Sequence, residues 1–226
     1  MTKVFIIMYN RLSWPKQMSE FLSDTGCEVI LIDNNSTYKP LLDWYDTSCP
    51  YKVHRLNENL GHKVFWKSGL HKEYSDQFYV VTDHDLDISN IPHDYINLLH
   101  EGFKNNPTVI KSALSLEIDD LPDNIYAKKV YDWEIKWWRN MQDPMGFYRS
   151  DADTTFALYD RNREYLEFPD TDRFFSSVRS PRPYVARHLP WYLTKEDINT
   201  NEEERYYQLN TTTYWSTIFK EDFNIS

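Results

Sequence analysis

The chain has 226 residues, of which 41% are hydrophobic and 27% are charged, and this length suits one large domain with a single buried core. Its 25 lysines and arginines against 35 aspartates and glutamates give a formal net charge of −10, which excludes a general nucleic-acid binder because such proteins need a basic face. Cys27 and Cys49 are too few for a disulfide framework or a cysteine zinc site, so we expect reduced thiols.

No stretch of the sequence is typical of a leader peptide or a membrane span. The apolar run at residues 3–8 is far too short to cross a bilayer, and no cleavage-like segment follows it. We therefore expect a soluble, cytoplasmic protein without a transmembrane segment. In that compartment the sequons at Asn35, Asn210 and Asn224 would stay unmodified.

Strand-like and helix-like segments alternate over the first hundred residues. Short runs rich in branched apolar residues predict buried strands at residues 4–8, 28–32 and 78–82, and residues 52–56 predict a weaker third strand. Helical patterns lie between these strands, opening at Pro15, after Asn59 and at Pro92. The alternation predicts parallel β-α units and therefore an α/β fold.

A polar cluster follows three of the predicted strands. The clusters are Asn10-Arg11, residues 33–36 and residues 83–87. Because ligands of open parallel sheets bind at the carboxyl ends of the strands, these clusters mark the candidate site.

The second half of the chain is less regular. We expect strands at residues 108–116 and 155–159, a helix with an aromatic face at 122–140, and a strand and loop at 181–192. From residue 193 the sequence is polar and acidic, and only a short helix around residues 202–209 is predicted. The simplest interpretation is one domain followed by a loose C-terminal extension.

The glycines limit how the chain can bind a nucleotide. There are five, and no two of them stand in a G-x-G spacing, which excludes both a Rossmann dinucleotide fingerprint and a P-loop. A nucleotide diphosphate would have to be held by other groups.

Three aspartates, Asp83, Asp85 and Asp87, directly follow the strand predicted at 78–82. Carboxylates this close repel one another unless a cation or hydrogen-bond donors offset their charge. A solvated acidic turn that caps the next helix is the simplest alternative. An EF-hand loop is excluded, because Ile88 and Asp94 stand where that loop needs Gly and Glu, and because a strand comes before it.

In its context this cluster resembles the DxD motif of glycosyltransferases with the GT-A fold, in particular family-2-like members. Three other segments agree in order: Tyr9-Asn10-Arg11, the "DN-x-S" turn at residues 32–37 and the "N-x-G" segment at residues 57–62. Residues 148–159 and 185–192 also resemble small bacterial and large-DNA-virus relatives.

The resemblance implies a GT-A fold, a Rossmann-like architecture with a mixed, mainly parallel sheet flanked by helices. It further implies a glycosyltransferase domain at residues 1–192, with a nucleotide-sugar half at 1–100, an acceptor half at 101–192, and an extension at 193–226.

The resemblance also implies a divalent cation, Mn²⁺ or Mg²⁺, between the donor diphosphate and a DxD carboxylate, in place of a glycine-rich loop. Asp85 would hold this metal, with His188 from a late loop and Asp87 as further ligands. Asp87 has an equally plain interpretation as a helix cap, and a lone histidine such as His188 is more often structural.

Ten residues are implied in donor binding. They are Tyr9, Asn10, Arg11, Asp33, Asn59, His62, Asp83, His84, Asp85 and Arg187. By the family pattern Asp83 contacts the ribose, and Asp33 accepts the uracil imide hydrogen, which favours a uridine donor and then a thymidine donor. Simpler roles stay open: a plain turn at Asp33, a side chain of His84 that points away from the site, and a surface ion pair at Arg187. Asn59 and His62 have the alternative of capping a helix.

The general base is the least certain part of the resemblance. Asp153 is the candidate that would deprotonate an acceptor hydroxyl, and Asp151 is the alternative. The "E-D" pair of inverting family-2 enzymes is absent after Tyr159, where Asp170 and Asp172 are the nearest acidic residues. The stereochemical course is therefore open.

Eight tryptophans are many for this length, and most are expected in the core. Some could instead stack against sugar rings: Trp133, Trp137, Trp138 and Trp191. The predicted function is transfer of a sugar from a nucleotide donor, UDP-linked by preference, to a glycan hydroxyl, with no role for nucleic acid. A sugar nucleotidyltransferase is disfavoured because no glycine-rich, basic signature lies near the N-terminus. A non-catalytic carbohydrate-binding module is the other alternative.

Overall fold

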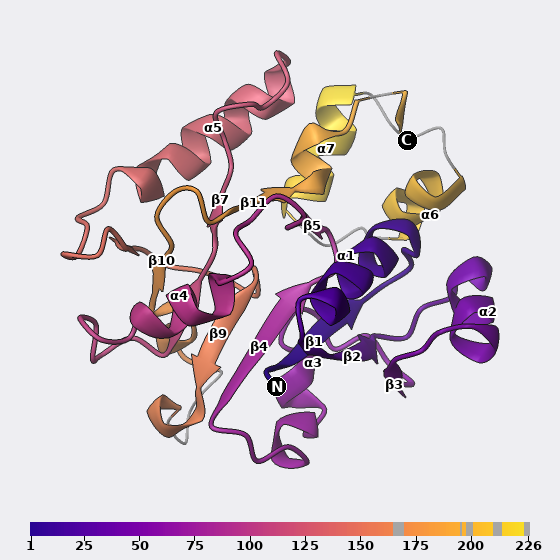
Figure 1. The fold of residues 1–226 in the computed structure, drawn as a ribbon. Helices are drawn as coiled ribbons and strands as arrows, with labels where there is room; N and C mark the ends of the chain where they lie inside the picture. The colour runs from indigo at the N-terminus through magenta and orange to yellow at the C-terminus, as the bar shows by residue number, and fades with distance from the viewer. Residues whose placement is uncertain (165–169, 195, 198–200, 210–213, 224–226) are drawn as a thin grey trace.

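The computed structural model describes the chain except for residues 165–169, 195, 198–200, 210–213 and 224–226 (Figure 1). Among the described residues, eight strands form a main sheet in the order β3-β2-β1-β4-β9-β6-β10-β8. These strands are β1 (Lys3–Met8), β2 (Glu28–Asp33), β3 (Lys52–Arg55), β4 (Phe78–Asp83), β6 (Lys111–Ala113), β8 (Tyr148–Arg149), β9 (Ala157–Asp160) and β10 (Ser177–Arg179). A small second sheet has the order β5-β11-β7, built from β5 (Leu86–Asp87), β7 (Ser115–Leu116) and β11 (Val185–His188).

The first four strands of the main sheet run parallel, and β9 runs antiparallel between β4 and β6. The mixed, mainly parallel sheet predicted from the sequence is therefore confirmed. Parallel pairing brings the carboxyl ends of β1, β2 and β4 to one edge, where the polar clusters follow.

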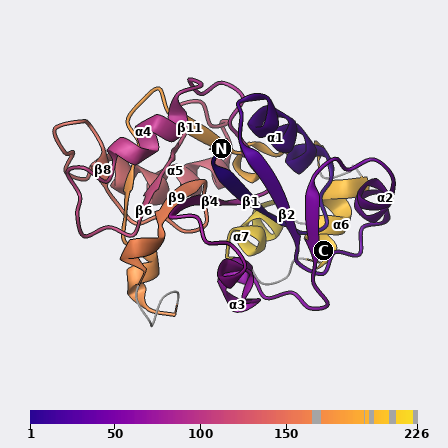
Figure 2. The ribbon, with the colours of Figure 1, turned by 60° about the horizontal axis from the view of Figure 1, so that its bottom comes forward.

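Helices cover both faces of the sheet. They are α1 (Ser13–Asp24), α2 (Lys39–Thr47), α3 (Val64–Lys67), α4 (Tyr95–Glu101), α5 (Ile125–Trp138), α6 (Asn201–Leu209) and α7 (Tyr214–Phe223). Figure 2 shows α1 and α3 on opposite sides of β1 and β2. Alternate residues of β1 divide between two cores, with Ile6 in the cluster that includes Met18 of α1 and Phe5 in the cluster that includes Phe65 of α3.

Three predicted elements differ from the observed ones. The helix expected directly after Asn59 is the short α3, and Asn59 does not cap it, because its Oδ1 accepts a hydrogen bond from the amide of Gly61 instead. The strand expected at 108–116 is divided at Leu114, so that β6 joins the main sheet and β7 joins the small one. The aromatic helix is α5, capped by Asn124, whose Oδ1 accepts from the amide of Ala127 at 2.8 Å.

The C-terminal segment is not a loose extension in its described part. Tyr207 of α6 and Phe219 of α7 are buried and stack with ring centroids 4.9 Å apart. Phe219 also packs on Tyr126 of α5, again at 4.9 Å. The helix predicted around residues 202–209 is confirmed as α6, whereas α7 and the packing of both helices against the core were not predicted from this polar composition.

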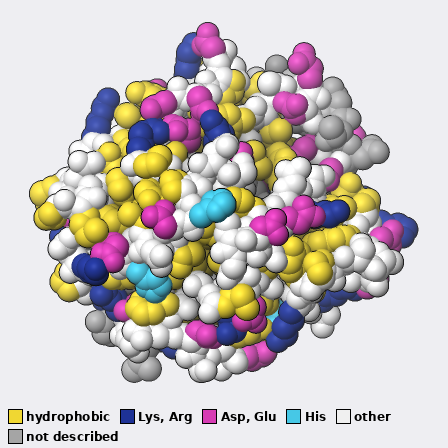
Figure 3. All heavy atoms as spheres, in the orientation of Figure 1, with side chains coloured by type: hydrophobic (Ala, Val, Ile, Leu, Met, Phe, Trp, Pro, Cys, Tyr) yellow, Lys and Arg dark blue, Asp and Glu magenta, His cyan; other side chains and the backbone are white. Residues whose placement is uncertain are grey.

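The described residues contain no helix long and apolar enough to cross a membrane. On the face drawn in Figure 3, lysines and arginines are interspersed with acidic and hydrophobic side chains, without a continuous basic strip among the described residues. This face offers no surface of the kind that binds a nucleic-acid backbone.

Candidate functional site

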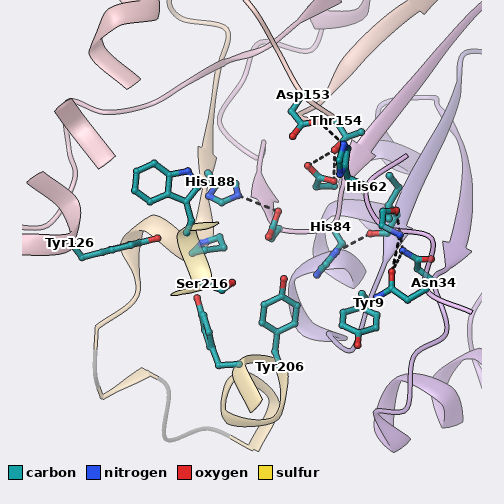
Figure 4. Close-up of a pocket in the computed structure, with 18 residues that line it drawn as sticks. Tyr9, Asn34, His62, His84, Tyr126, Asp153, Thr154, His188, Tyr206 and Ser216 are labelled. Atoms are coloured by element: carbon teal, nitrogen blue, oxygen red, sulfur yellow. Dashed lines mark hydrogen bonds and ion pairs between the residues drawn. The ribbon is translucent and has the colours of Figure 1, made fainter. Parts of the chain in front are cut away.

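A cavity of about 300 Å³ opens at the carboxyl ends of β1, β2 and β4 (Figure 4). Of the predicted site residues, eight line it: Tyr9, Asn59, His62, Asp83, His84, Asp85, Asp153 and His188. The predicted site is thus brought together from segments far apart in the sequence. Other residues of the lining come from α5 and from the two C-terminal helices.

Asp83 is the last residue of β4 and is fixed by the segment before β9. The hydroxyl of Thr154 lies 2.8 and 2.9 Å from the two carboxylate oxygens of Asp83. The backbone amide of Asp83 donates in turn to the carbonyl of Thr154 at 3.1 Å. Burial raises the pKa of Asp83 well above its ordinary value, and the carboxylates of Asp85 and Asp153 add to this shift. Asp83 is therefore suited to donate a hydrogen bond as well as to accept one.

Asp85 is in the opposite electrostatic state. Burial by itself would raise the pKa of Asp85, but the imidazoles of His188 and His84 and the guanidinium of Arg11 hold it below its usual range. Its Oδ2 lies 3.3 Å from Nη1 of Arg11, whereas its buried Oδ1 has no hydrogen-bond partner among the described residues and lies 3.6 Å from Nε2 of His188. Asp85 thus presents an ionised oxygen toward the cavity.

Burial disfavours protonation of the two imidazoles beside Asp85. His84 donates from Nδ1 to the carbonyl of Ile7 at 2.8 Å, which leaves Nε2 as a buried acceptor without a hydrogen-bond partner in the described structure. Burial lowers the pKa of His84 to about 4. Burial likewise lowers the pKa of His188, whose ring packs on Trp191 with centroids 4.7 Å apart. His84 therefore faces the site, against the alternative that it points away.

Asp153 and His62 form the outer rim of the cavity. The Asp153 carboxylate is about half exposed, and its Oδ1 lies 3.7 Å from Nε2 of His62. Its backbone carbonyl accepts a hydrogen bond from the buried ammonium of Lys111 at 2.7 Å. Figure 4 shows Asp153 and Thr154 above His62 on the same side of the cavity. An exposed carboxylate at this rim is accessible to a second substrate.

The loops after β2 and β3 are joined by Asn34, a residue that the sequence reasoning did not single out. Its Nδ2 donates to Oδ1 of Asn59 at 2.8 Å and its Oδ1 accepts from the amide of Leu60 at 2.8 Å. Asn34 is buried and lines the cavity. Its position in the "DN-x-S" turn was the available signal.

Asn10 and Asp33 support the site from behind rather than line it. Asn10 is fully buried in the left-handed region (φ 50°), and its Oδ1 accepts from the amides of Thr37 and Tyr38 at 2.7 and 2.9 Å. Asp33 is 3% exposed and accepts from the amide of Ser36 at 3.2 Å, and burial raises its pKa. Both residues fix the loops that shape the cavity.

Besides Asn10 and Asp33, three more predicted site residues lie outside the cavity lining. Asp87 accepts from the amide and hydroxyl of Ser89 at 2.9 and 2.7 Å in a local turn, and it does not cap α4, whose N-cap is Asp94. Arg187 is held by Asp120 on the surface, with Nε 2.8 Å from its carboxylate. Asp151 is exposed and does not line the cavity. The surface ion pair considered for Arg187 matches this geometry, because strand alternation turns Arg187 away from its neighbour His188, and Asp87 is the residue paired with Arg187 across β5 and β11.

Arg11 is also placed differently from the prediction. It is fully buried and absent from the cavity lining, and its guanidinium is bound by the carboxylate of Glu203 and by Asp85. Direct contact with a donor would require these pairs to break. The partner Glu203 lies 192 positions away, so no local pattern could reveal this contact.

The C-terminal helices supply a wall of the cavity. Its residues, together with one from α5, are Tyr126, Tyr206, Tyr207, Trp215 and Ser216. Of the tryptophans considered as a sugar platform, Trp191 is 3% exposed and belongs to the core, whereas Trp133 on α5 is 46% exposed. Trp215, which no sequence signal marked, is the tryptophan that lines the cavity.

The side chains that could ligate a metal fit a divalent cation in part. Asp85 and His188 offer a bare carboxylate oxygen and an imidazole nitrogen 3.6 Å apart, both ligand types that Mn²⁺ accepts. Within the described ranges, however, no group of three or more His, Cys, Asp or Glu side chains is arranged to hold a metal. A cation here would need further ligands from a substrate phosphate or water.

Comparison with solved structures identifies the architecture. The chain is similar to GalNAc-T7 with UDP, GalNAc and Mn²⁺ (TM-score 0.55, 14% identity, 99% of this chain and 55% of that chain). It is also similar to HddC from Yersinia pseudotuberculosis complexed with GMP-PN (TM-score 0.52, 12% identity, 91% and 100% covered). The fold is that of the GT-A glycosyltransferases. At these identities the likeness establishes the fold alone.

A third similar structure is glucosyl-3-phosphoglycerate synthase from Mycobacterium tuberculosis in complex with phosphoglyceric acid (TM-score 0.43, 12% identity, 72% of this chain). The chain spans 57% of that protein and 55% of GalNAc-T7, little more than half the length of either. No protein-family model matches the chain, and no curated protein is similar to it in sequence.

Proposed function

We propose that the chain is a metal-dependent glycosyltransferase that moves a sugar from a nucleotide donor, UDP-linked by preference, to a glycan hydroxyl. The observation that carries the proposal is the ionised, unpartnered Oδ1 of Asp85, which faces His188 in a cavity at the carboxyl ends of parallel strands. Arg11 contacts only Oδ2 of Asp85 and is shared with Glu203, so a cation at Oδ1 would offset the remaining buried negative charge. The GT-A fold supports the same function.

Asp85 and His188 would hold the cation, which when bound would act as a Lewis acid toward the donor diphosphate. Asp83, with its raised pKa, would donate a hydrogen bond to a hydroxyl of the nucleotide-sugar or accept one from it. His84, with its neutral Nε2, would accept a further one. Each of these residues therefore has a distinct role in holding the donor.

Asp153 is the better placed of the two candidate bases, because its exposed carboxylate lines the cavity and that of Asp151 does not. The acceptor hydroxyl would give its proton to Asp153 as its oxygen bonds to the anomeric carbon of the donor sugar. The bond from that carbon to the diphosphate would break, and its electron pair would leave on the diphosphate.

The donor base is inferred from the turn at Asp33, which is buried behind the cavity. The fold itself accommodates both a uridine and a guanosine nucleotide, since one similar structure contains UDP and another GMP-PN. A uridine preference is therefore a property that has to be measured on this chain.

The proposal is tested by incubating the protein with a panel of UDP-, dTDP- and GDP-sugars and Mn²⁺ and measuring nucleoside diphosphate release with and without glycan acceptors. We expect release from a UDP-sugar, and a fall of about 10² to 10⁴-fold in Asp153→Asn. Asp151→Asn, which removes a neighbouring exposed carboxylate, should leave the rate unchanged. Release from no donor would favour the carbohydrate-binding alternative, and pyrophosphate release from a nucleoside triphosphate and a sugar phosphate would favour the nucleotidyltransferase.

A further inference from the structure

Helix α6 is attached to the start of α1 by an acidic side chain. Helix α1 has no capping side chain of its own at Leu12. Instead, Oε1 of Glu202 accepts from the amides of Leu12 and Ser13 at 2.8 and 2.9 Å, and its Oε2 accepts from the Ser13 hydroxyl at 2.8 Å. The C-terminal segment thus caps an N-terminal helix, and Figure 1 shows the two helices side by side.

The neighbouring residue Glu203 binds Arg11 with both oxygens. Nε and Nη2 of Arg11 lie 3.0 and 2.7 Å from the two carboxylate oxygens of Glu203, a bidentate pair. The guanidinium carbon lies 3.4 Å from the ring centre of Tyr206 and 4.4 Å from that of Trp14. Arg11 is therefore enclosed between α6 and α1. Its position is set by the bidentate pair with Glu203 and by the rings of Tyr206 and Trp14.

The same guanidinium reaches Asp85 with one nitrogen only. Nη1 lies 3.3 Å from Oδ2, while Oδ1 stays without a hydrogen-bond partner and faces His188. A guanidinium can pair with both oxygens of one carboxylate. With Nε and Nη2 held by Glu203, Arg11 contacts Asp85 through Nη1 alone, and Asp85 keeps its second oxygen open toward the cavity.

We propose that Arg11 and Glu203 are positioning residues, through which the docking of α6 keeps the metal-facing oxygen of Asp85 available. The inference rests on the proposed function and adds a role for the C-terminal segment in it. The three buried groups, Arg11, Asp85 and Glu203, carry one positive and two negative charges, so a divalent cation at Asp85 offsets an excess negative charge. Loss of the Glu203 charge removes that excess and frees the fork of Arg11 to cover both oxygens of Asp85.

Coupling between two sites is reciprocal. If docked α6 favours the metal–nucleotide complex, then the bound complex must in turn stabilise docked α6. Tyr206 lines the cavity and packs on Arg11, so it would carry this coupling to a nucleotide bound there.

The test compares wild type with Glu203→Gln, which keeps the shape of the side chain and removes its charge. Glu204→Gln is the matched control, because Glu204 is exposed on the same helix and accepts a hydrogen bond from its helix neighbour Gln208 at 3.2 Å. The first readout is hydrogen exchange of the ligand-free protein in α6 and at residues 185–193. The latter segment reports on Asp85, whose carbonyl accepts from the amide of Leu189 at 2.9 Å. The second readout is the calorimetric Kd of UDP in the presence of Mn²⁺.

We expect Glu203→Gln to speed hydrogen exchange in both segments at least tenfold. We also expect it to raise the Kd of UDP at least tenfold, and each tenfold change corresponds to about 1.4 kcal/mol. Glu204→Gln should stay within twofold of wild type. In wild type, UDP with Mn²⁺ should slow exchange in α6. Glu203→Asp, which keeps the charge and shortens its reach, should shift the readouts in the same direction by less, and it serves if Glu203→Gln does not fold.

Faster exchange in α6 alone, with residues 185–193 and the Kd unchanged, would overturn the proposal and leave Glu203 as a structural contact. If wild type itself does not bind UDP with Mn²⁺, the proposed function fails, and the ligand-free exchange still decides whether Glu203 controls Asp85.

Discussion

Lys111 predicts an unusual dependence of stability on pH. This residue of β6 is fully buried, and its ammonium donates to the carbonyl of Asp153 at 2.7 Å and to the hydroxyl of Tyr159 at 3.2 Å. Burial lowers the pKa of Lys111 from 10.5 to about 7, although the carboxylates of Asp153 and Asp83 act in the other direction. The folded protein therefore releases this proton well before the unfolded chain does.

Between pH 7 and 10.5 the unfolded state holds this proton more tightly, so the free energy of unfolding rises with pH by about 1.4 kcal/mol for each pH unit. The whole gain across that window is about 4 to 5 kcal/mol. Below pH 7 the lysine is charged in both states and the fold bears the full cost of its burial. In Lys111→Met the group is absent, so the difference in stability between wild type and variant should follow this slope.

The assay is urea unfolding of wild type and Lys111→Met at intervals from pH 6 to pH 9.5, with Lys16→Met as the control. Lys16 is exposed on α1 and should give curves parallel to wild type at every pH. Between pH 7 and 9.5 the free energy of unfolding of wild type should rise by about 3 kcal/mol relative to that of Lys111→Met. Parallel curves for Lys111→Met would refute the reasoning, because they would mean that the buried lysine keeps its ordinary pKa.

Two further predictions concern packing and buried charge. In Gly102→Ala the new methyl group would press on the Ser112 hydroxyl and lie 2.9 Å from the Phe147 ring, so we expect a loss of about 1–3 kcal/mol, measured as a fall in Tm. Arg179→Met leaves Glu134, its buried ion-pair partner, without compensation, and unfolding in urea should show a loss of about 3–5 kcal/mol that Arg179→Met combined with Glu134→Leu largely restores. If Gly102→Ala is as stable as wild type, the packing argument is contradicted. If the double variant is no more stable than Arg179→Met alone, the charge argument is contradicted.

The sequence predicts well those parts of the fold that depend on local patterns. Three of the four N-terminal strands are short apolar runs, and all four, including the weaker β3, are observed close to their expected bounds. The polar residues that follow them meet at one edge because parallel strands end there, so Tyr9, Asp83 and Asp85 are brought together as expected. Asp153 was added from the resemblance, and the structure places it on the same cavity.

The parts that could not be predicted depend on contacts between distant segments. Nothing local distinguishes Asp87 from Asp85, and only the pairing of β5 with β11 separates their environments. The contact of Arg11 with Glu203 joins the first loop to the last helices, and aromatic residues scattered in a polar segment did not reveal that Tyr206 lines the cavity.

The most direct test of the central claim is calorimetric titration of UDP, with and without Mn²⁺, into wild type, Asp85→Asn and Asp87→Asn. The account predicts that UDP binds wild type only with Mn²⁺, that Asp85→Asn weakens this binding by roughly tenfold or more, and that Asp87→Asn, which alters a carboxylate bound to Ser89, leaves it unchanged. Binding that needs no metal, or that survives intact in Asp85→Asn, would contradict a metal–nucleotide site at Asp85.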